Sequence, residues 1–149
     1  MRAIVERVSQ ASVTVDGNVV GAIGRGLLVY VGVGKDDGEA DVAYLCDKIA
    51  GLRIFTDEAG KMNLSVSDVG GGLLVISAFA LQADARKGRR PSFDAAADPE
   101  PARALYDALC DRLAAAGLPV ARGVFRAKMH VACVNEGPIC ILLDSKRLF

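Results

Sequence analysis

The stretch Gly26-Leu27-Leu28-Val29-Tyr30-Val31-Gly32-Val33 sets the fold class. It is a continuous β-prone run that no charged residue interrupts, and this pattern is typical of a strand buried on both faces. Just before it, two short valine-rich segments flank Asp16-Gly17. An Asp-Gly pair between β-prone segments predicts a hairpin. The first part of the chain is therefore expected to be a group of paired strands.

Two amphipathic helices are expected after these strands. The first carries one apolar stripe at helical spacing, made of Val42, Leu45, Cys46, Ile49 and Leu52. The second has Asp98 as its cap and Pro99 at its first position, and it ends before Gly117. Its apolar face contains Leu105, Leu109 and Leu113. Because Cys46 and Cys110 lie on or beside these faces, we expect both to be core residues.

The remaining β-prone segments complete a mixed α/β domain. Further strands are expected at 52–55, 73–81, 120–125, 130–135 and 138–144. A turn at 57–60 joins the first two of these. The expected order is ββ(β)-α-ββ-α-βββ, with helices packed against a sheet rather than a regular parallel βαβ array. We expect one domain over residues 1–149.

Composition limits the classes of function. The 149 residues are 52% apolar and 24% charged, which excludes a disordered or fibrous chain. Because 18 basic residues balance 18 acidic ones, any contact with nucleic acid must come from a local basic patch. No apolar run approaches the roughly 20 residues of a membrane span. Glu6 and Arg7 interrupt the segment where a signal peptide would be apolar, so we expect a cytoplasmic protein.

Residues suited to metal or histidine chemistry are few. The four cysteines form no C-x-x-C pair, and His130 is the only histidine. A structural zinc site and a nucleophile activated by histidine are therefore not expected, and we interpret His130 as a strand residue. The glycines do not form a P-loop either. If the chain is an enzyme, its site works with backbone groups.

Two segments are candidates for a functional site. Ser77-Ala78-Phe79-Ala80-Leu81 ends a predicted strand, and its small residues would let backbone N–H groups face a ligand, as an oxyanion hole requires. An ordinary strand end has the same pattern. Asn135-Glu136-Gly137-Pro138 fits a simple turn between two strands. Such a turn would make Cys133 and Cys140 cross-strand neighbours, and we expect them to be packed thiols.

A third segment, Arg86-Lys87-Gly88-Arg89-Arg90-Pro91-Ser92-Phe93, is a basic loop. Four of its first five residues are cations, and glycine and proline prevent it from forming a helix. It is suited to phosphate contacts, with Phe93 as a stacking side chain, although a solvated basic loop is the alternative. Other cations would extend this surface if the fold gathers them: Arg122, Arg126, Lys128, Lys146 and Arg147.

These segments, in this order, carry a family resemblance. Further matching segments are Arg7-Val8-Ser9-Gln10-Ala11-Ser12-Val13, Gly24-Arg25-Gly26-Leu27-Leu28-Val29, Leu52-Arg53-Ile54-Phe55, Gly60-Lys61-Met62-Asn63 and Leu143-Asp144. Together with the basic loop and the Asn-Glu-Gly-Pro segment, they resemble the D-aminoacyl-tRNA deacylases, formerly described as D-tyrosyl-tRNA deacylases. The resemblance covers nearly the whole chain.

The resemblance implies a fold, an activity and partners. Members are homodimers of three-layer β-β-α domains that hydrolyse the ester between a D-amino acid and the 3′-terminal adenosine of tRNA, without a metal or organic cofactor. Gly137 and Pro138 match a Gly-cisPro motif that enters the partner subunit's pocket and excludes L-side chains. Arg7 matches an arginine that braces this motif. Because glycine has no side chain to exclude, glycyl-tRNA is an expected side substrate.

The family's first motif, Ser-Gln-Phe-Thr, corresponds to residues 77–80. Its backbone amides hold the substrate carbonyl, a role that falls on Ser77, Phe79 and Ala80, while Ala78 contributes to substrate binding. Two polar side chains of the motif are thus alanine here, and the threonine that follows Gly-Pro in the family is Cys140. If amides are the catalytic groups, activity survives these changes. We interpret Cys140 as a packing residue rather than a substitute nucleophile, because no base adjoins it in sequence.

Contacts with tRNA are expected from Arg86, Lys87, Arg89, Arg90 and Phe93. Two alternatives to D-aminoacyl-tRNA hydrolysis stay open. One is an editing enzyme of the same fold with altered aminoacyl specificity. The other is a tRNA-binding protein that has lost catalysis.

Overall fold

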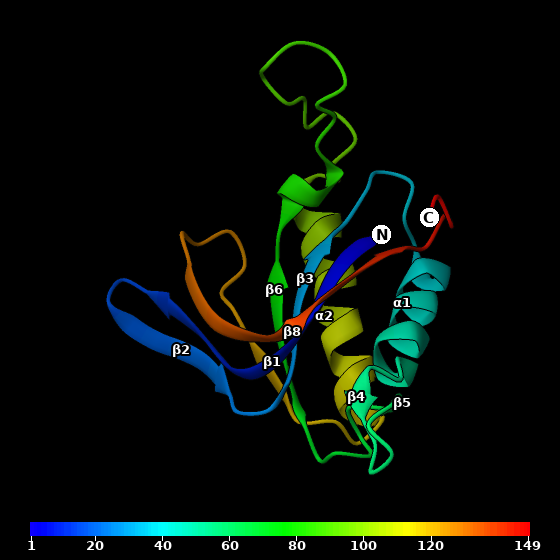
Figure 1. Cartoon of the computed structure of the whole chain (residues 1–149). Coiled ribbons are helices and arrows are strands. Elements are labelled where there is room, and N and C mark those ends of the chain that lie inside the picture. The colour runs from blue at the N-terminus through cyan, green and yellow to red at the C-terminus, as the bar shows by residue number, and fades with distance from the viewer.

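In the computed structural model, which describes residues 1–149, the chain forms a mixed α/β fold (Figure 1). The elements are β1 (Arg2–Val15), β2 (Asn18–Ile23), β3 (Gly26–Gly32), α1 (Glu39–Gly51), β4 (Phe55–Thr56), β5 (Met62–Leu64), β6 (Gly72–Ser77), the 3-10 helix η1 (Phe79–Gln82), α2 (Pro99–Ala115), β7 (Val120–Arg122) and β8 (His130–Asp144). Neither helix is long and apolar enough to cross a membrane.

β3 lies in the middle of the main sheet, as its continuous apolar sequence predicts. The strand order is β2-β1-β3-β6-β7, and β8 pairs with β1. β3 runs antiparallel to β1 and parallel to β6, so the sheet is mixed. Leu27, Leu28 and Val29 are fully buried, because other residues cover both faces of this strand.

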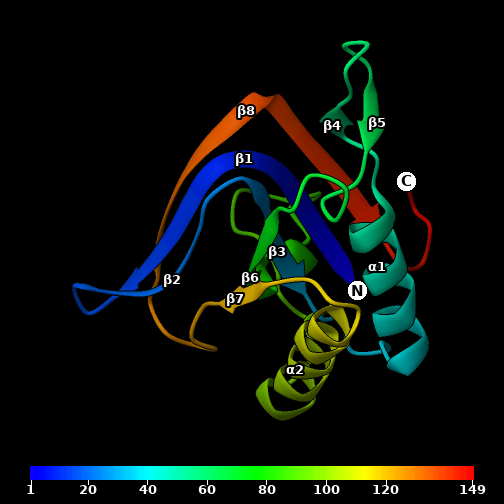
Figure 2. The same cartoon turned by 90° about the horizontal axis from the view of Figure 1, so that it is seen from below.

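The sheet folds over on itself, since β1 and β8 are long and bent (Figure 2). The first half of β1 pairs with β3 and its second half pairs with β2, while β8 follows β1 along most of its length. Between the two halves lies a small core of Val8, Ala11, Val13, Leu28, Leu74 and Ile76. A larger core separates the sheet from α1 and α2. The mixed α/β class is therefore as predicted, with one core between the halves of the sheet and one beneath the helices.

Local sequence signals account for the hairpin and both helices. Asp16 (φ 49°) and Gly17 (φ 78°) both have positive φ, as in a two-residue type I′ turn. The apolar stripe of α1 is buried. In α2 the Tyr106 hydroxyl donates a hydrogen bond to the Val75 carbonyl of β6 at 2.8 Å. Cys110 on the same helix is fully buried, and Cys46 of α1 is buried too, as predicted.

Four predicted segments were wrong. Of the strand expected at 52–55, only Phe55 lies in a strand, because α1 continues to Gly51 and β4 covers Phe55–Thr56. The strand expected at 73–81 stops at Ser77, because its neighbour β3 ends at Gly32 and offers no further partner. The turn at 57–60 closes a small hairpin of β4 and β5 and does not lead to β6. The strand expected at 120–125 stops at Arg122. The order therefore has three strands between the helices and two after α2.

The C-terminal segment also differs from the prediction. Residues 130–144 form one strand with a large bulge rather than a hairpin, because Val8 pairs with Asn135 and Glu6 pairs with Cys140. Residues 136–139 therefore loop out opposite Arg7 alone. Cys133 and Cys140 are exposed, so the expectation of packed thiols was wrong.

Candidate active site

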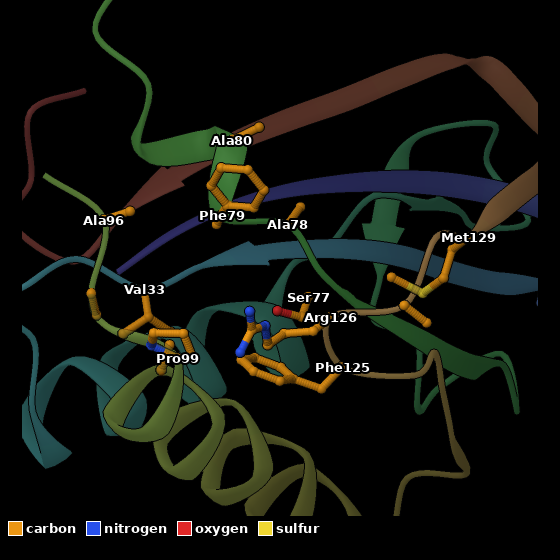
Figure 3. A pocket seen from close by; sticks show the side chains of 13 residues that line it. Val33, Ser77, Ala78, Phe79, Ala80, Ala96, Pro99, Phe125, Arg126 and Met129 are labelled. Atoms are coloured by element: carbon orange, nitrogen blue, oxygen red, sulfur yellow. The ribbon is translucent and has the colours of Figure 1, made fainter. Parts of the chain in front are cut away.

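A cavity of about 430 Å³ opens where β6 passes into η1. Ten of its thirteen lining residues are hydrophobic (Figure 3). They come from the ends of β3 and β6, from η1, from the start of α2 and the segment before it, and from the loop between β7 and β8. The volume lies within the range of small-molecule sites. His130 is exposed at the start of β8 and does not line the cavity.

The predicted segment 77–80 lies in this pocket, since all four of its residues line it. The Ala78 N–H donates to the Val31 carbonyl at 2.8 Å and so extends the sheet. Phe79 and Ala80 open η1, and the first N–H groups of a helix have no acceptor within it. The pocket segment thus offers two adjacent backbone donors. The Ser77 side chain adds a hydroxyl.

Two side-chain hydrogen bonds tie the turn η1 to distant parts of the chain. Gln82 is buried, and its Nε2 donates to the carbonyl of Gly32 at the end of β3 at 2.8 Å. Arg2 Nη1 donates to the Leu81 carbonyl at 3.0 Å. Arg2 Nε also pairs with the buried carboxylate of Asp144 at 3.0 Å. These contacts fix the backbone that lines the pocket.

The sequence did not predict the wall formed by Phe125, Arg126 and Met129. The fold brings this loop to β6, where the Gly123 N–H donates to the Val75 carbonyl at 3.1 Å. Gly123 is the one residue in the sequence that could have indicated this close packing. A Cβ there would lie only 2.6 Å from the Met129 sulfur, so any larger residue would make the Met129 side chain move.

Gly137 and Pro138 are not brought to this pocket. They are exposed at the bulge of β8, and the peptide bond between them is cis. Arg7 Nε donates to the Glu136 carbonyl at 2.9 Å, and Arg7 Nη1 donates to the Ile54 carbonyl at 2.7 Å. The side chain of Asn135 closes the bulge by accepting the Ile139 N–H at 2.8 Å. The motif is therefore held rigidly at a surface outside its own pocket.

The basic loop stands next to the pocket. Asp84 and Ser92 exchange two backbone hydrogen bonds at its base, of 2.8 and 2.9 Å. Phe93 packs edge-on against Phe79 of η1, with 4.9 Å between ring centroids. Arg86 forms a two-point ion pair with Asp84, which holds the pKa of that carboxyl well below its usual range. The remaining cations of the loop, Lys87, Arg89 and Arg90, are exposed.

Sequence comparison establishes the family. The model of the D-Tyr-tRNA(Tyr) deacylase family matches residues 4–144. The chain belongs to this family. The D-aminoacyl-tRNA deacylases of Anaeromyxobacter dehalogenans and Thermotoga petrophila are 62% and 58% identical to it, over 100% of both chains in each case. The resemblance read from the sequence is confirmed, and the chain is an enzyme of a hydrolase family.

Two solved structures are similar. One, described as a c-Myc DNA Unwinding Element Binding Protein, has a TM-score of 0.91 at 38% identity, over 97% of this chain and 98% of that one. The other, described as a probable eukaryotic D-amino acid tRNA deacylase, has a TM-score of 0.84 at 18% identity, over 95% and 97%. The second likeness shows the shared fold alone.

Proposed function

We propose that this deacylase removes D-amino acids from the 3′-terminal adenosine of tRNA by hydrolysing the ester bond. The observation that carries the proposal is the pocket at the junction of β6 and η1, where a free hydroxyl and two backbone donors lie among apolar walls. The pocket holds no histidine, cysteine or carboxylate side chain. An aminoacyl ester suits such a site because it is already activated toward water.

The chemistry then needs little from side chains. Water attacks the ester carbonyl, and the N–H groups of Phe79 and Ala80 stabilise the oxyanion that forms. The bond from the carbonyl carbon to the ribose oxygen breaks, and the proton of the water passes to that oxygen with the help of the neighbouring 2′-hydroxyl. The products are the free amino acid and intact tRNA. Alanine at 78 and 80 keeps both amides, and no cofactor is required.

Chiral selection is assigned to the exposed Gly137-Pro138 segment. A second copy of the chain would bring this segment to the pocket, since the chain's own motif lies outside it. The motif's carbonyl oxygens then form a wall that excludes L-side chains by steric clash. Arg7 keeps the wall in place through its bond to the Glu136 carbonyl. The functional unit is therefore a homodimer, and glycyl-tRNA also enters the site.

The basic loop is assigned to the tRNA backbone. Lys87, Arg89 and Arg90 supply the charge, while Arg86 contributes less because Asp84 neutralises it. Phe93 extends the apolar rim of the pocket next to Phe79, where a base can stack. The expected location of the protein is the cytoplasm, where its substrate is found.

Deacylation of D-Tyr-tRNA, L-Tyr-tRNA and Gly-tRNA tests this proposal. The unmodified protein is expected to hydrolyse the D-ester and the glycyl ester and to spare the L-ester. Gly137→Ala should raise hydrolysis of the L-ester by roughly tenfold or more, about 1.4 kcal/mol of lost discrimination. The reason is that Gly137 has φ +137°, and a Cβ there would lie 2.7 Å from Ile139 Cγ1, which displaces the wall.

Gly24→Ala is the matched control, because a Cβ at Gly24 meets nothing within 4 Å. Equal hydrolysis of both enantiomers by the unmodified protein would favour an editing enzyme of altered specificity. Binding of charged tRNA without hydrolysis would favour the lapsed enzyme. Unchanged discrimination in the Gly137 variant would contradict the role of the wall.

A further inference from the structure

Arg126 is the only charged side chain that lines the pocket. Ten of the other lining residues are hydrophobic, and Ser77 has the only other polar side chain. Arg126 is an exposed residue at the pocket wall; its side chain extends over the pocket (Figure 3) and forms no ion pair or hydrogen bond within the chain. A guanidinium in an apolar pocket with no protein partner is a site for an anion brought by a ligand.

The backbone at Arg126 supports a functional reading. The loop turns at Val124–Ala127, where the Ala127 N–H donates to the Val124 carbonyl at 3.1 Å. Arg126 is the third residue of this turn and has φ +64°, a conformation that favours glycine. Non-glycine residues in this region are strained and cluster at functional sites. Position 126 of this turn would therefore suit glycine best, yet it holds an arginine whose long side chain lines the pocket.

The charges of the substrate decide which of its groups can bind the Arg126 guanidinium. This step rests on the proposed function. An aminoacyl-tRNA presents three groups near the ester: the neutral ester, the positive α-ammonium and the negative phosphodiester on the 5′ side of the terminal adenosine. Arg126 repels the α-ammonium, so the amino group must lie away from it. The phosphodiester is the only anion near the ester in every such substrate, whatever the amino acid.

We propose that Arg126 binds the phosphodiester on the 5′ side of the terminal adenosine and thereby fixes the direction in which the substrate enters. The basic loop continues this electrostatic path, because its base packs on the rim of the same pocket through Phe93 and Phe79. Arg126 is on this account a substrate-binding residue that acts on the nucleotide and not on the reacting ester.

The test compares two small substrates that differ only in phosphate, D-tyrosyl-adenosine and D-tyrosyl-cytidylyl-adenosine. Arg126→Gln is expected to lower kcat/KM for the phosphate-bearing ester by about tenfold, mainly through KM, because one charge-assisted contact is lost. It should leave the phosphate-free ester within about twofold. Arg126→Lys should restore part of the loss. Lys128→Gln, an exposed cation outside the pocket, is the control for net charge.

Direct binding separates this inference from the proposed function. Calorimetry with uncharged cytidylyl-adenosine and with adenosine needs no catalysis, and the Arg126 preference for the dinucleotide should appear even if no ester is hydrolysed. Equal losses on both esters would mean that Arg126 acts on the ester itself and would overturn the inference. So would a loss confined to D-aspartyl esters, which would assign Arg126 to a side-chain carboxylate, or no loss at all.

Discussion

The thiols of Cys133 and Cys140 both contact the carboxylate of Glu6. The Cys133 sulfur lies 3.6 Å from Oε2, and the Cys140 sulfur lies 3.7 Å from Oε1. Partial burial and the Glu6 charge raise the pKa of Cys133, and the same two causes raise the pKa of Tyr30 to about 12. A negative charge beside a thiol disfavours its thiolate, and neither cysteine lines the pocket. Cys140 is therefore not part of the core, and it lies outside the pocket where a nucleophile would be needed.

Alkylation of Cys133 by iodoacetamide measures this effect. In a Cys140→Ser background, where Cys46 and Cys110 are buried, Cys133 is the exposed thiol. Because its pKa is raised, it should react slowly at pH 8 and speed up only at higher pH. Glu6→Gln should accelerate the reaction at pH 8 by up to about tenfold, the change for one pKa unit. Glu58→Gln on the surface is the control, and an equal rate in both variants would contradict the role of Glu6.

The sequence predicted a helix or strand correctly where the pattern that causes it lies within the segment itself, and failed where contacts with distant residues decide. The burial of β3 and the stripes of α1 and α2 follow from periodicity within each segment. The end of β6 does not, because the apolar run 73–81 continues past the point where β3 stops pairing with it. The bulge in β8 depends on Arg7 and on the side chain of Asn135, whose bonds no local pattern reveals. The turn at Arg126 was not predicted, because a residue with positive φ is usually recognised by a glycine and this position holds arginine.

The turn η1 depends on Gln82, and this can be measured. Gln82→Leu removes the side-chain donor to the buried Gly32 carbonyl, which ties η1 to the end of β3. We expect the free energy of unfolding to fall by about 0.5–1.5 kcal/mol, and kcat for D-Tyr-tRNA to fall because the amides of η1 move. Chemical denaturation and single-turnover rates give both values. Gln10→Leu at an exposed position of β1 is the control. An unchanged kcat in the Gln82 variant would show that η1 is fixed by other contacts.

For the whole molecule, the bent sheet separates the two motifs that the sequence singled out. Residues 77–80 lie in the pocket, while Gly137 and Pro138 are exposed at the bulge of β8. The sequence predicted both motifs and the basic loop. It did not predict that the motifs lie apart, because the pairing of β8 with β1 decides this. Nor did it predict the opposite wall of the pocket, which depends on the packing of the 123–129 loop on β6. Under the proposed function, a site assembled from two copies of the chain would bring the two motifs together.

The central claim is that backbone amides carry the chemistry in a pocket whose two motif side chains are alanine. Its most direct test is the rate of D-Tyr-tRNA hydrolysis by the unmodified protein beside the Ala78→Gln/Ala80→Thr double variant. We expect clear hydrolysis by the unmodified protein, and in the double variant a gain of at most about a hundredfold, because two regained hydrogen bonds contribute roughly 0.5–1.5 kcal/mol each. No hydrolysis by the unmodified protein, with activity regained only in the double variant, would contradict the account.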